Sequence, residues 1–81
     1  MSKINLEQII SIISSKINVP ENELDINSVS TDFYKWDSLA QLNIVLEIEK
    51  KISKKIDASI MGDLTSIKSI IDYLRKLDVI S

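Results

Sequence analysis

Ser38, with Asp37 before it, is the point of this 81-residue chain where residue type and spacing best suit chemistry. A largely apolar segment follows, so the pattern predicts a helix that starts at Ser38 with the Asp37 carboxylate as its N-cap. The Ser38 hydroxyl would then lie in solvent at the helix mouth. A negative group on that oxygen would meet unpaired N–H groups and the positive end of the helix dipole. We therefore expect Ser38 to carry a covalent phosphodiester.

Other chemistries lack the residues that they need. The chain has no Cys and no His, which excludes disulfides, a thiol nucleophile and Ser–His catalysis, and we expect no metal site. Glu21, Glu23 and Asp25 lie in a polar loop with nothing to desolvate them as general acids would require. Trp36, the only tryptophan, is expected to cover the start of the second helix. The chain is therefore not expected to be an enzyme.

Composition favours one small helical domain over residues 1–81. Hydrophobic residues make up 44% and charged residues 27%, as in globular proteins, and one Gly and one Pro are few for an all-β fold. The net charge of −2 gives no electrostatic reason to bind nucleic acid or an acidic membrane. No apolar run reaches signal-peptide or transmembrane length. We expect a cytoplasmic monomer that does not insert into membranes.

Apolar spacing predicts the first helix from Ile4 to Ile17. Ile12 falls outside its main stripe and is expected to be half exposed, and Pro20 ends the helix by disfavouring helical backbone at Val19. The connection over residues 18–37 is long for a compact domain. Its scattered apolar residues predict that it is pinned across the helices.

The second helix is predicted from Ser38 to Ile52 and carries two apolar stripes. One consists of Ile44, Val45, Ile48 and Ile52, and the other of Leu39, Leu42 and Leu46. A surface helix needs only one buried face. The leucine stripe is therefore either buried by a neighbouring helix or exposed for a partner.

The remaining segment predicts a short helix within 57–64, closed near Gly62, and a last helix capped by Thr65-Ser66. The stripe of the last helix consists of Ile67, Ile70, Ile71, Leu74 and Leu77. Asp72 and Lys76 have the spacing of an ion pair, and residues 78–81 are expected to fray. The predicted fold is an all-α bundle of three longer helices and one short helix, with a long loop between the first two.

Four lysines, Lys50, Lys51, Lys54 and Lys55, follow the acidic residues of the second helix. They can offset the dipole at the C-terminus of that helix as a solvated end. This solvated end is the favoured interpretation, and a docking patch is the alternative that stays open at this point.

The stretch Trp36-Asp37-Ser38-Leu39-Ala40-Gln41-Leu42 resembles the start of the second helix in acyl and peptidyl carrier proteins, a family marked by Asp-Ser-Leu there. The resemblance extends from the first helix to Ile71-Asp72-Tyr73-Leu74, and the form is similar to discrete acyl carrier proteins. It implies that a phosphopantetheinyl transferase (holo-acyl-carrier-protein synthase), using magnesium, moves 4′-phosphopantetheine from coenzyme A to Ser38. The thiol of that group would then carry acyl or aminoacyl cargo as a thioester between acyl-loading and acyl-transfer enzymes.

The resemblance also implies roles for other positions. Partner enzymes would contact Asp37, Leu39, Leu42, Leu46 and Glu49. The interior that shelters acyl chains would be lined by Ile44, Ile48, Ile56, Met61, Leu64 and Ile70.

The sequence departs from the family at two places. Lys35-Trp36 stands where the family usually has Gly, and Asn43 and Lys50 stand at positions that are often acidic. The standard fatty-acid enzymes attract carriers through basic patches, so we expect a specialised biosynthetic pathway instead. The alternative to the carrier interpretation is an unmodified helical docking or scaffold module in which Ser38 is a helix cap.

Overall fold

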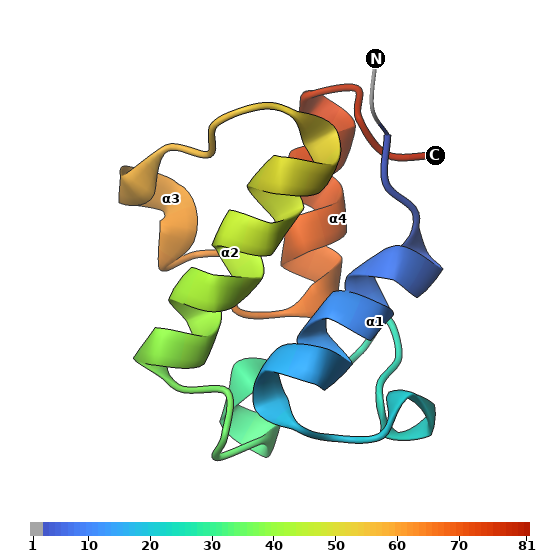
Figure 1. The fold of residues 1–81 in the computed structure, drawn as a ribbon, viewed down its shortest axis with the longest axis vertical. Coiled ribbons are helices and arrows are strands. Elements are labelled where there is room, and N and C mark those ends of the chain that lie inside the picture. Colours follow the sequence, from blue (N-terminus) through green and yellow to red (C-terminus); the bar gives the residue numbers. More distant parts are fainter. Residues whose placement is uncertain (1–2) are drawn as a thin grey trace.

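Four α-helices make up the computed structural model, which describes residues 3–81 (Figure 1). They are α1 (Leu6–Ile17), α2 (Ser38–Ile52), the one-turn α3 (Ala58–Met61) and α4 (Ile67–Lys76). Within the described residues only two isolated bridges pair extended backbone, so the all-α prediction of three longer helices and one short helix is confirmed.

The helix α1 begins later than predicted because Asn5 caps it. The Asn5 side chain accepts from the Gln8 N–H, and the Gln8 side chain accepts from the Asn5 N–H, so the two satisfy each other's backbone groups. Ile4 lies outside the helix in extended backbone. Asn18 ends the helix in the left-handed conformation, two residues before Pro20.

Ile12 is buried, so the prediction of half exposure was wrong. The physical reason is that α1 contacts both α2 and α4, which makes its buried face wider than a single stripe. Ile9, Ile13 and Ile17 share that face. Leu6, which the periodicity placed on the stripe, is more than a third exposed.

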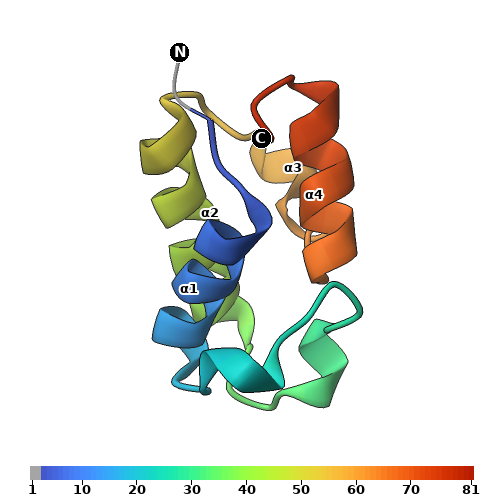
Figure 2. The same cartoon turned by 90° about the vertical axis from the view of Figure 1, so that its right-hand side faces the viewer.

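One apolar cluster joins α1, α2 and α4. Figure 2 shows α1 and α2 side by side on one side of the molecule and α4 with α3 on the other. The largest side chains that are fully buried in the cluster are Ile4, Ile9, Ile13, Ile17, Ile44, Val45, Ile48, Ile52, Ile67, Ile70, Leu74 and Val79. Isoleucine thus fills most of the core.

The connection over residues 18–37 crosses the end of the molecule from which α2 starts (Figure 2). Its two short 3₁₀ turns lie at Glu21–Glu23 and Ser30–Asp32. The Ser30 N–H donates to the Thr65 carbonyl over 2.7 Å, and the Ile67 N–H donates to the Ser28 carbonyl over 3.1 Å. These bonds confirm that the connection is pinned, here to the start of α4.

The last residues do not fray, so that prediction was wrong. Val79 is buried, and its carbonyl accepts from the Ile4 N–H over 2.8 Å. The Ser81 N–H donates to the Ile4 carbonyl over 2.8 Å, and Ile4 pairs with Ile80 as a parallel bridge. The extended segment before α1 therefore holds residues 79–81 in place through these backbone hydrogen bonds.

The predicted pair of Asp72 with Lys76 was also wrong. Asp72 Oδ1 lies 3.8 Å from Arg75 Nη1, one residue closer along α4. Both spacings bring side chains together on a helix. The longer guanidinium of Arg75 takes the carboxylate at the nearer spacing.

Candidate functional site

Ser38 is the first residue of α2 and is exposed to solvent. The Asp37 carboxylate accepts from the Ala40 N–H over 2.9 Å, and the Asp37 carbonyl accepts from the Gln41 N–H over 2.8 Å. The predicted N-cap is therefore confirmed. The first N–H groups of a helix have no intrahelical acceptor, and the helix dipole is positive at this end. The surroundings of the Ser38 hydroxyl therefore favour a negative group.

Behind this start, Trp36 and Gln41 form a buried polar contact. Trp36 Nε1 donates to Gln41 Oε1 over 2.7 Å, which confirms that Trp36 covers the beginning of α2. Gln41 Nε2 donates to the carbonyl oxygens of Met61, over 2.9 Å, and Leu64, over 2.7 Å. One side chain thereby connects α2 to the end of α3 and to the segment that leads from α3 to α4.

Sequence reasoning missed Gln41 as a structural residue. The signal was present in the spacing, because Gln41 precedes Ile44, Val45 and Ile48 by three, four and seven residues and so belongs to the buried stripe. A polar residue on a core stripe must find hydrogen-bond partners.

A surface hollow of about 510 Å³ lies beside Ser38. Besides Asp37 and Trp36, its lining includes Ser30, Gln41, Ala58, Met61, Gly62 and Thr65. The hollow therefore combines three hydroxyl groups, those of Ser30, Ser38 and Thr65, with apolar surface from α3. An open, partly polar hollow suits a slender chain with amide groups better than a purely hydrocarbon one.

Asp57 is the N-cap of α3, which lines the hollow beside Ser38 with Ala58 and Met61. Asp57 Oδ1 accepts from the Ser59 N–H over 2.9 Å, and hydrogen bonds from the backbone and side chain of Ser59 lower the pKa of Asp57. The ionised carboxylate of Asp57 therefore stabilises the single turn of α3.

The stripe of Leu39, Leu42 and Leu46 is exposed, which resolves the alternative left open by the sequence. Their exposed fractions are 68%, 40% and 45%, whereas Ile44, Val45, Ile48 and Ile52 are buried. The exposed stripe begins one residue after Ser38. It gives α2 an apolar face that no other element within residues 3–81 covers.

The six positions expected in the interior do come together. Ile44, Ile48, Ile56, Leu64 and Ile70 are buried in the one core cluster, and Met61 is partly buried against it. Met61 also lines the hollow beside Ser38, so it lies between that hollow and the core.

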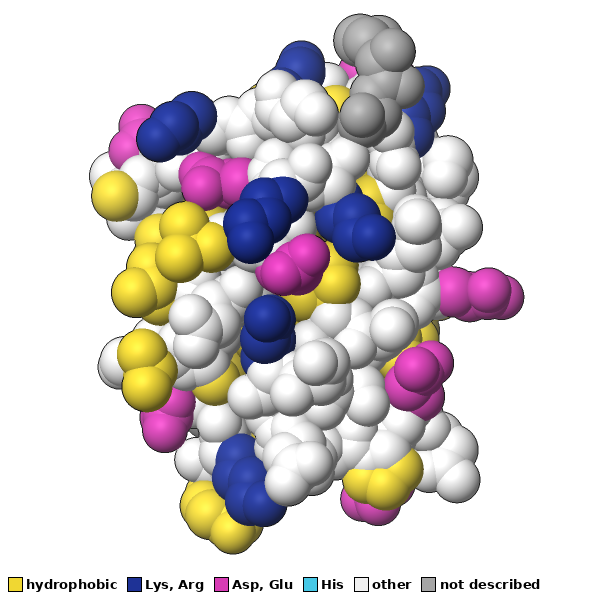
Figure 3. Space-filling view, viewed as in Figure 1, with side chains coloured by type: hydrophobic (Ala, Val, Ile, Leu, Met, Phe, Trp, Pro, Cys, Tyr) yellow, Lys and Arg dark blue, Asp and Glu magenta, His cyan; other side chains and the backbone are white. Residues whose placement is uncertain are grey.

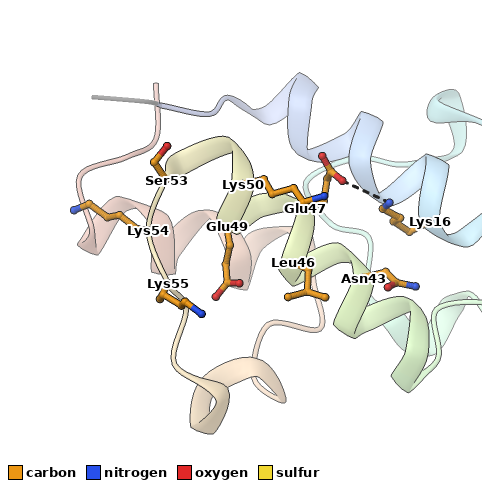
Figure 4. A pocket seen from close by; sticks show the side chains of 9 residues that line it. All are labelled: Lys16, Asn43, Leu46, Glu47, Glu49, Lys50, Ser53, Lys54 and Lys55. Carbon is orange, nitrogen blue, oxygen red and sulfur yellow. Dashed lines mark ion pairs between the residues drawn. The ribbon is translucent and has the colours of Figure 1, made fainter.

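Glu49, expected on the contact face, is only partly exposed, and its Oε2 accepts from the Ile56 N–H over 2.6 Å. This bond fixes the segment that leaves α2. Glu49 also borders a second hollow, of about 540 Å³, which we name the lysine hollow (Figure 4). Its other lining residues are Lys16, Asn43, Leu46, Glu47, Lys50, Ser53, Lys54 and Lys55.

Neither a metal cluster nor a membrane span is found within residues 3–81. No group of three or more Asp, Glu, His or Cys residues there is arranged to hold an ion. None of the helices in that range combines the length and the apolar character that crossing a bilayer requires.

A protein-family model matches most of the chain. The model of a family described as phosphopantetheine attachment site matches residues 7–74 of the chain. The matched range includes all of α2 and α3 and most of α1 and α4. Ser38 and the α2 residues that line the two hollows therefore lie within it.

Proposed function

The chain belongs to the phosphopantetheine attachment family, whose members carry covalent 4′-phosphopantetheine, and we propose that Ser38 is the residue that bears the group. The observation that supports this choice is the exposed Ser38 hydroxyl at the capped start of α2. Ser66 also stands at the start of a long helix, but its hydroxyl is engaged with Ser69 in the N-cap of α4. Ser38 is therefore the better candidate.

The surroundings of Ser38 fit 4′-phosphopantetheine. Its phosphate would lie near the positive end of α2, where free N–H groups favour an anion. Its amide-containing arm would lie along the hollow beside Ser38, where Ser30 and Thr65 can donate or accept hydrogen bonds and Met61 offers apolar contact.

The attachment chemistry needs only one atom of this chain. The Ser38 oxygen forms a bond to the phosphorus of the pantetheine arm in coenzyme A, the pyrophosphate bond breaks, and adenosine 3′,5′-bisphosphate leaves. The hydroxyl proton goes to a base on the transferase. When bound, the group supplies a thiol that can hold an acyl or aminoacyl cargo as a thioester, which a chain without cysteine cannot form on its own.

The chain then acts as a carrier and leaves catalysis to its partners. Asp37 and the leucine stripe form the face that the transferase and the acyl-handling enzymes contact, and Glu49 supports that face through Ile56. The core cluster around Ile44, Ile48, Ile56, Met61, Leu64 and Ile70 provides the shelter for a bound acyl chain. The departures at Asn43 and Lys50 support a specialised biosynthetic pathway.

Intact mass spectrometry tests the assignment. The chain is incubated with coenzyme A, magnesium and a broad-specificity phosphopantetheinyl transferase, alongside Ser38→Ala and the control Ser11→Ala, which removes another exposed helical hydroxyl. We expect the wild type and Ser11→Ala to gain one phosphopantetheine and Ser38→Ala to gain none with unchanged helix content by circular dichroism. Modification of Ser38→Ala would place the attachment elsewhere. A wild-type sample, folded and initially unmodified, that several transferases fail to modify would favour the docking-module alternative.

A further inference from the structure

The C-terminal end of α2 carries positive charge although the chain as a whole is negative. Four lysines line the lysine hollow, namely Lys16, Lys50, Lys54 and Lys55, and Figure 4 shows that they come from α1, from α2 and from the segment after α2. Two carboxylates, Glu47 and Glu49, line it as well. The hollow thus has more cations than anions.

Both carboxylates of the hollow are already engaged. Glu47 Oε1 lies 3.6 Å from Lys16 Nζ, and Glu49 Oε2 accepts from the Ile56 N–H over 2.6 Å. The two ion pairs found within residues 3–81 are this one and Asp72–Arg75, so Lys50, Lys54 and Lys55 belong to neither. These three exposed cations can pair with anions supplied from outside the chain.

The same hollow is continuous with the leucine stripe. Leu46, the last leucine of the stripe, lines the lysine hollow. Figure 3 shows hydrophobic side chains gathered over the α2 and α3 side of this face, with Lys and Arg side chains next to them. Ser38 and Lys50 are twelve residues apart on one helix, which is about 18 Å at 1.5 Å per residue.

We infer that this surface docks an enzyme that has an apolar groove with an acidic rim at one end. The groove receives the leucine stripe, and the acidic rim faces Lys50, Lys54 and Lys55. The inference rests on the proposed function, because the enzyme is one that modifies or loads Ser38. An acidic rim about 18 Å from the catalytic centre of that enzyme fixes the direction of α2 in the groove. The charge contact therefore aligns Ser38 with the catalytic centre.

The observations favour a protein over other anionic partners. The lysines border exposed leucine, and apolar surface beside charge is typical of protein interfaces. A nucleic-acid groove would combine cations with aromatic stacking surfaces, and none of the hollow's lining residues is aromatic. Charges at the edge of an interface mainly raise the association rate and make it dependent on salt.

A charge-swap experiment tests the inference with defined proteins. The probes are a phosphopantetheinyl transferase that has a basic docking surface and the same enzyme with those basic residues changed to glutamate. Each is assayed for kcat/KM on the apo form of the 81-residue chain and on the triple variant Lys50→Glu, Lys54→Glu and Lys55→Glu. A matched variant with Lys51→Glu, Lys68→Glu and Lys76→Glu has the same net charge but leaves the lysine hollow intact.

We expect the acidic enzyme to prefer the wild type over the triple variant by about tenfold, and the basic enzyme to show the opposite preference. Both preferences should shrink as salt rises from about 50 to 500 mM, where screening removes the charge contact. The high-salt rates also verify that each enzyme form is active. With each enzyme, the triple variant Lys50→Gln, Lys54→Gln and Lys55→Gln should have a kcat/KM between those of the wild type and the glutamate variant. This graded result separates an effect of charge from a loss of folding.

Three results would overturn the inference. The first is an equal kcat/KM for the wild type and the triple variant with both enzymes. The second is that the matched variant changes kcat/KM as much as the triple variant does. The third is that the wild type, but not the triple variant, cosediments with phosphatidylserine vesicles in a salt-sensitive way while both have equal rates with the transferases. That result would assign the lysines to binding a membrane surface. Failure of the proposed function looks different, because then no variant gains mass with either enzyme.

Discussion

Trp36 and Gln41 are joined by a buried hydrogen bond of 2.7 Å from the indole Nε1 to the amide Oε1. Because Gln41 also donates to the carbonyls of Met61 and Leu64, the start of α2 and the segment between α3 and α4 are held by one side chain. The hollow beside Ser38 lies between these elements. Its shape therefore depends on Gln41 as well as on the apolar core.

Gln41→Leu tests this connection. Leucine has a similar size but leaves the Leu64 carbonyl and the Trp36 N–H, both in buried hydrogen bonds, without their partner, at about 1–3 kcal/mol for each buried unsatisfied group, whereas the Met61 carbonyl keeps the Leu64 N–H as a donor. We expect the free energy of unfolding in urea to fall by about 2–4 kcal/mol. Asn43→Leu, at an exposed position of the same helix, should change it by less than about 0.5 kcal/mol. Equal stability of both variants would show that the hydrogen bonds of Gln41 are dispensable.

A pair of alanine variants separates the two faces of α2. Ile48 is fully buried and Leu46 is 45% exposed, so Ile48→Ala should cost about 2–5 kcal/mol of stability and Leu46→Ala less than about 1 kcal/mol. Leu46→Ala should instead lower kcat/KM for transfer of phosphopantetheine by about threefold to tenfold. The measurements are urea unfolding and the intact-mass rate assay. A large stability loss in Leu46→Ala would move that residue into the core.

Removal of residues 79–81 tests the paired chain ends. The truncation exposes the surface that Val79 covers and removes its carbonyl as the acceptor for the Ile4 N–H, so we expect a loss of about 2–4 kcal/mol. Val79→Ala, which keeps the backbone bonds, should cost less than the truncation. An unchanged urea midpoint for the truncated chain would mean that the pairing contributes nothing to stability.

Acid should loosen α3 through Asp57. Its pKa in the folded chain lies below the ordinary value of 3.8, because Ser59 donates to the ionised carboxylate. The contribution to stability is therefore complete above pH values near 3.8 and is lost as the pH falls through the lower, folded-state pKa. Amide NMR shifts of residues 58–61 should report this transition, and Asp57→Asn should abolish it. A transition that persists in Asp57→Asn would have to come from another carboxylate.

Local signals account for the parts of this fold that the sequence predicted. Periodicity placed the long helices, and Asp37 and Ser66 marked two helix starts, because caps and stripes depend on neighbours a few residues away. Such signals act within one helix and need no knowledge of the rest of the fold. Ser38 could be singled out for the same reason.

The parts that were predicted wrongly depend on tertiary neighbours. Ile12 is buried because α1 has two partner helices, and Val79 is ordered because Ile4, far away in the sequence, pairs with that end. The hydrogen bond from the Ile56 N–H to Glu49, seven residues earlier, was not foreseen either, and the predicted partner contact of Glu49 stays a prediction. Helical spacing contains no information on any of these contacts.

The pairing of Ile4 with Ile80 also sets how the molecule can be handled. These segments meet at the end of the molecule opposite to the start of α2 (Figures 1 and 2). A reporter or a surface anchor joined at either paired segment would leave Ser38 pointing away from the attachment. Because Ile4 and Ile80 are paired, a short linker between these two segments could join them in a circularly permuted variant that is opened in an exposed loop elsewhere.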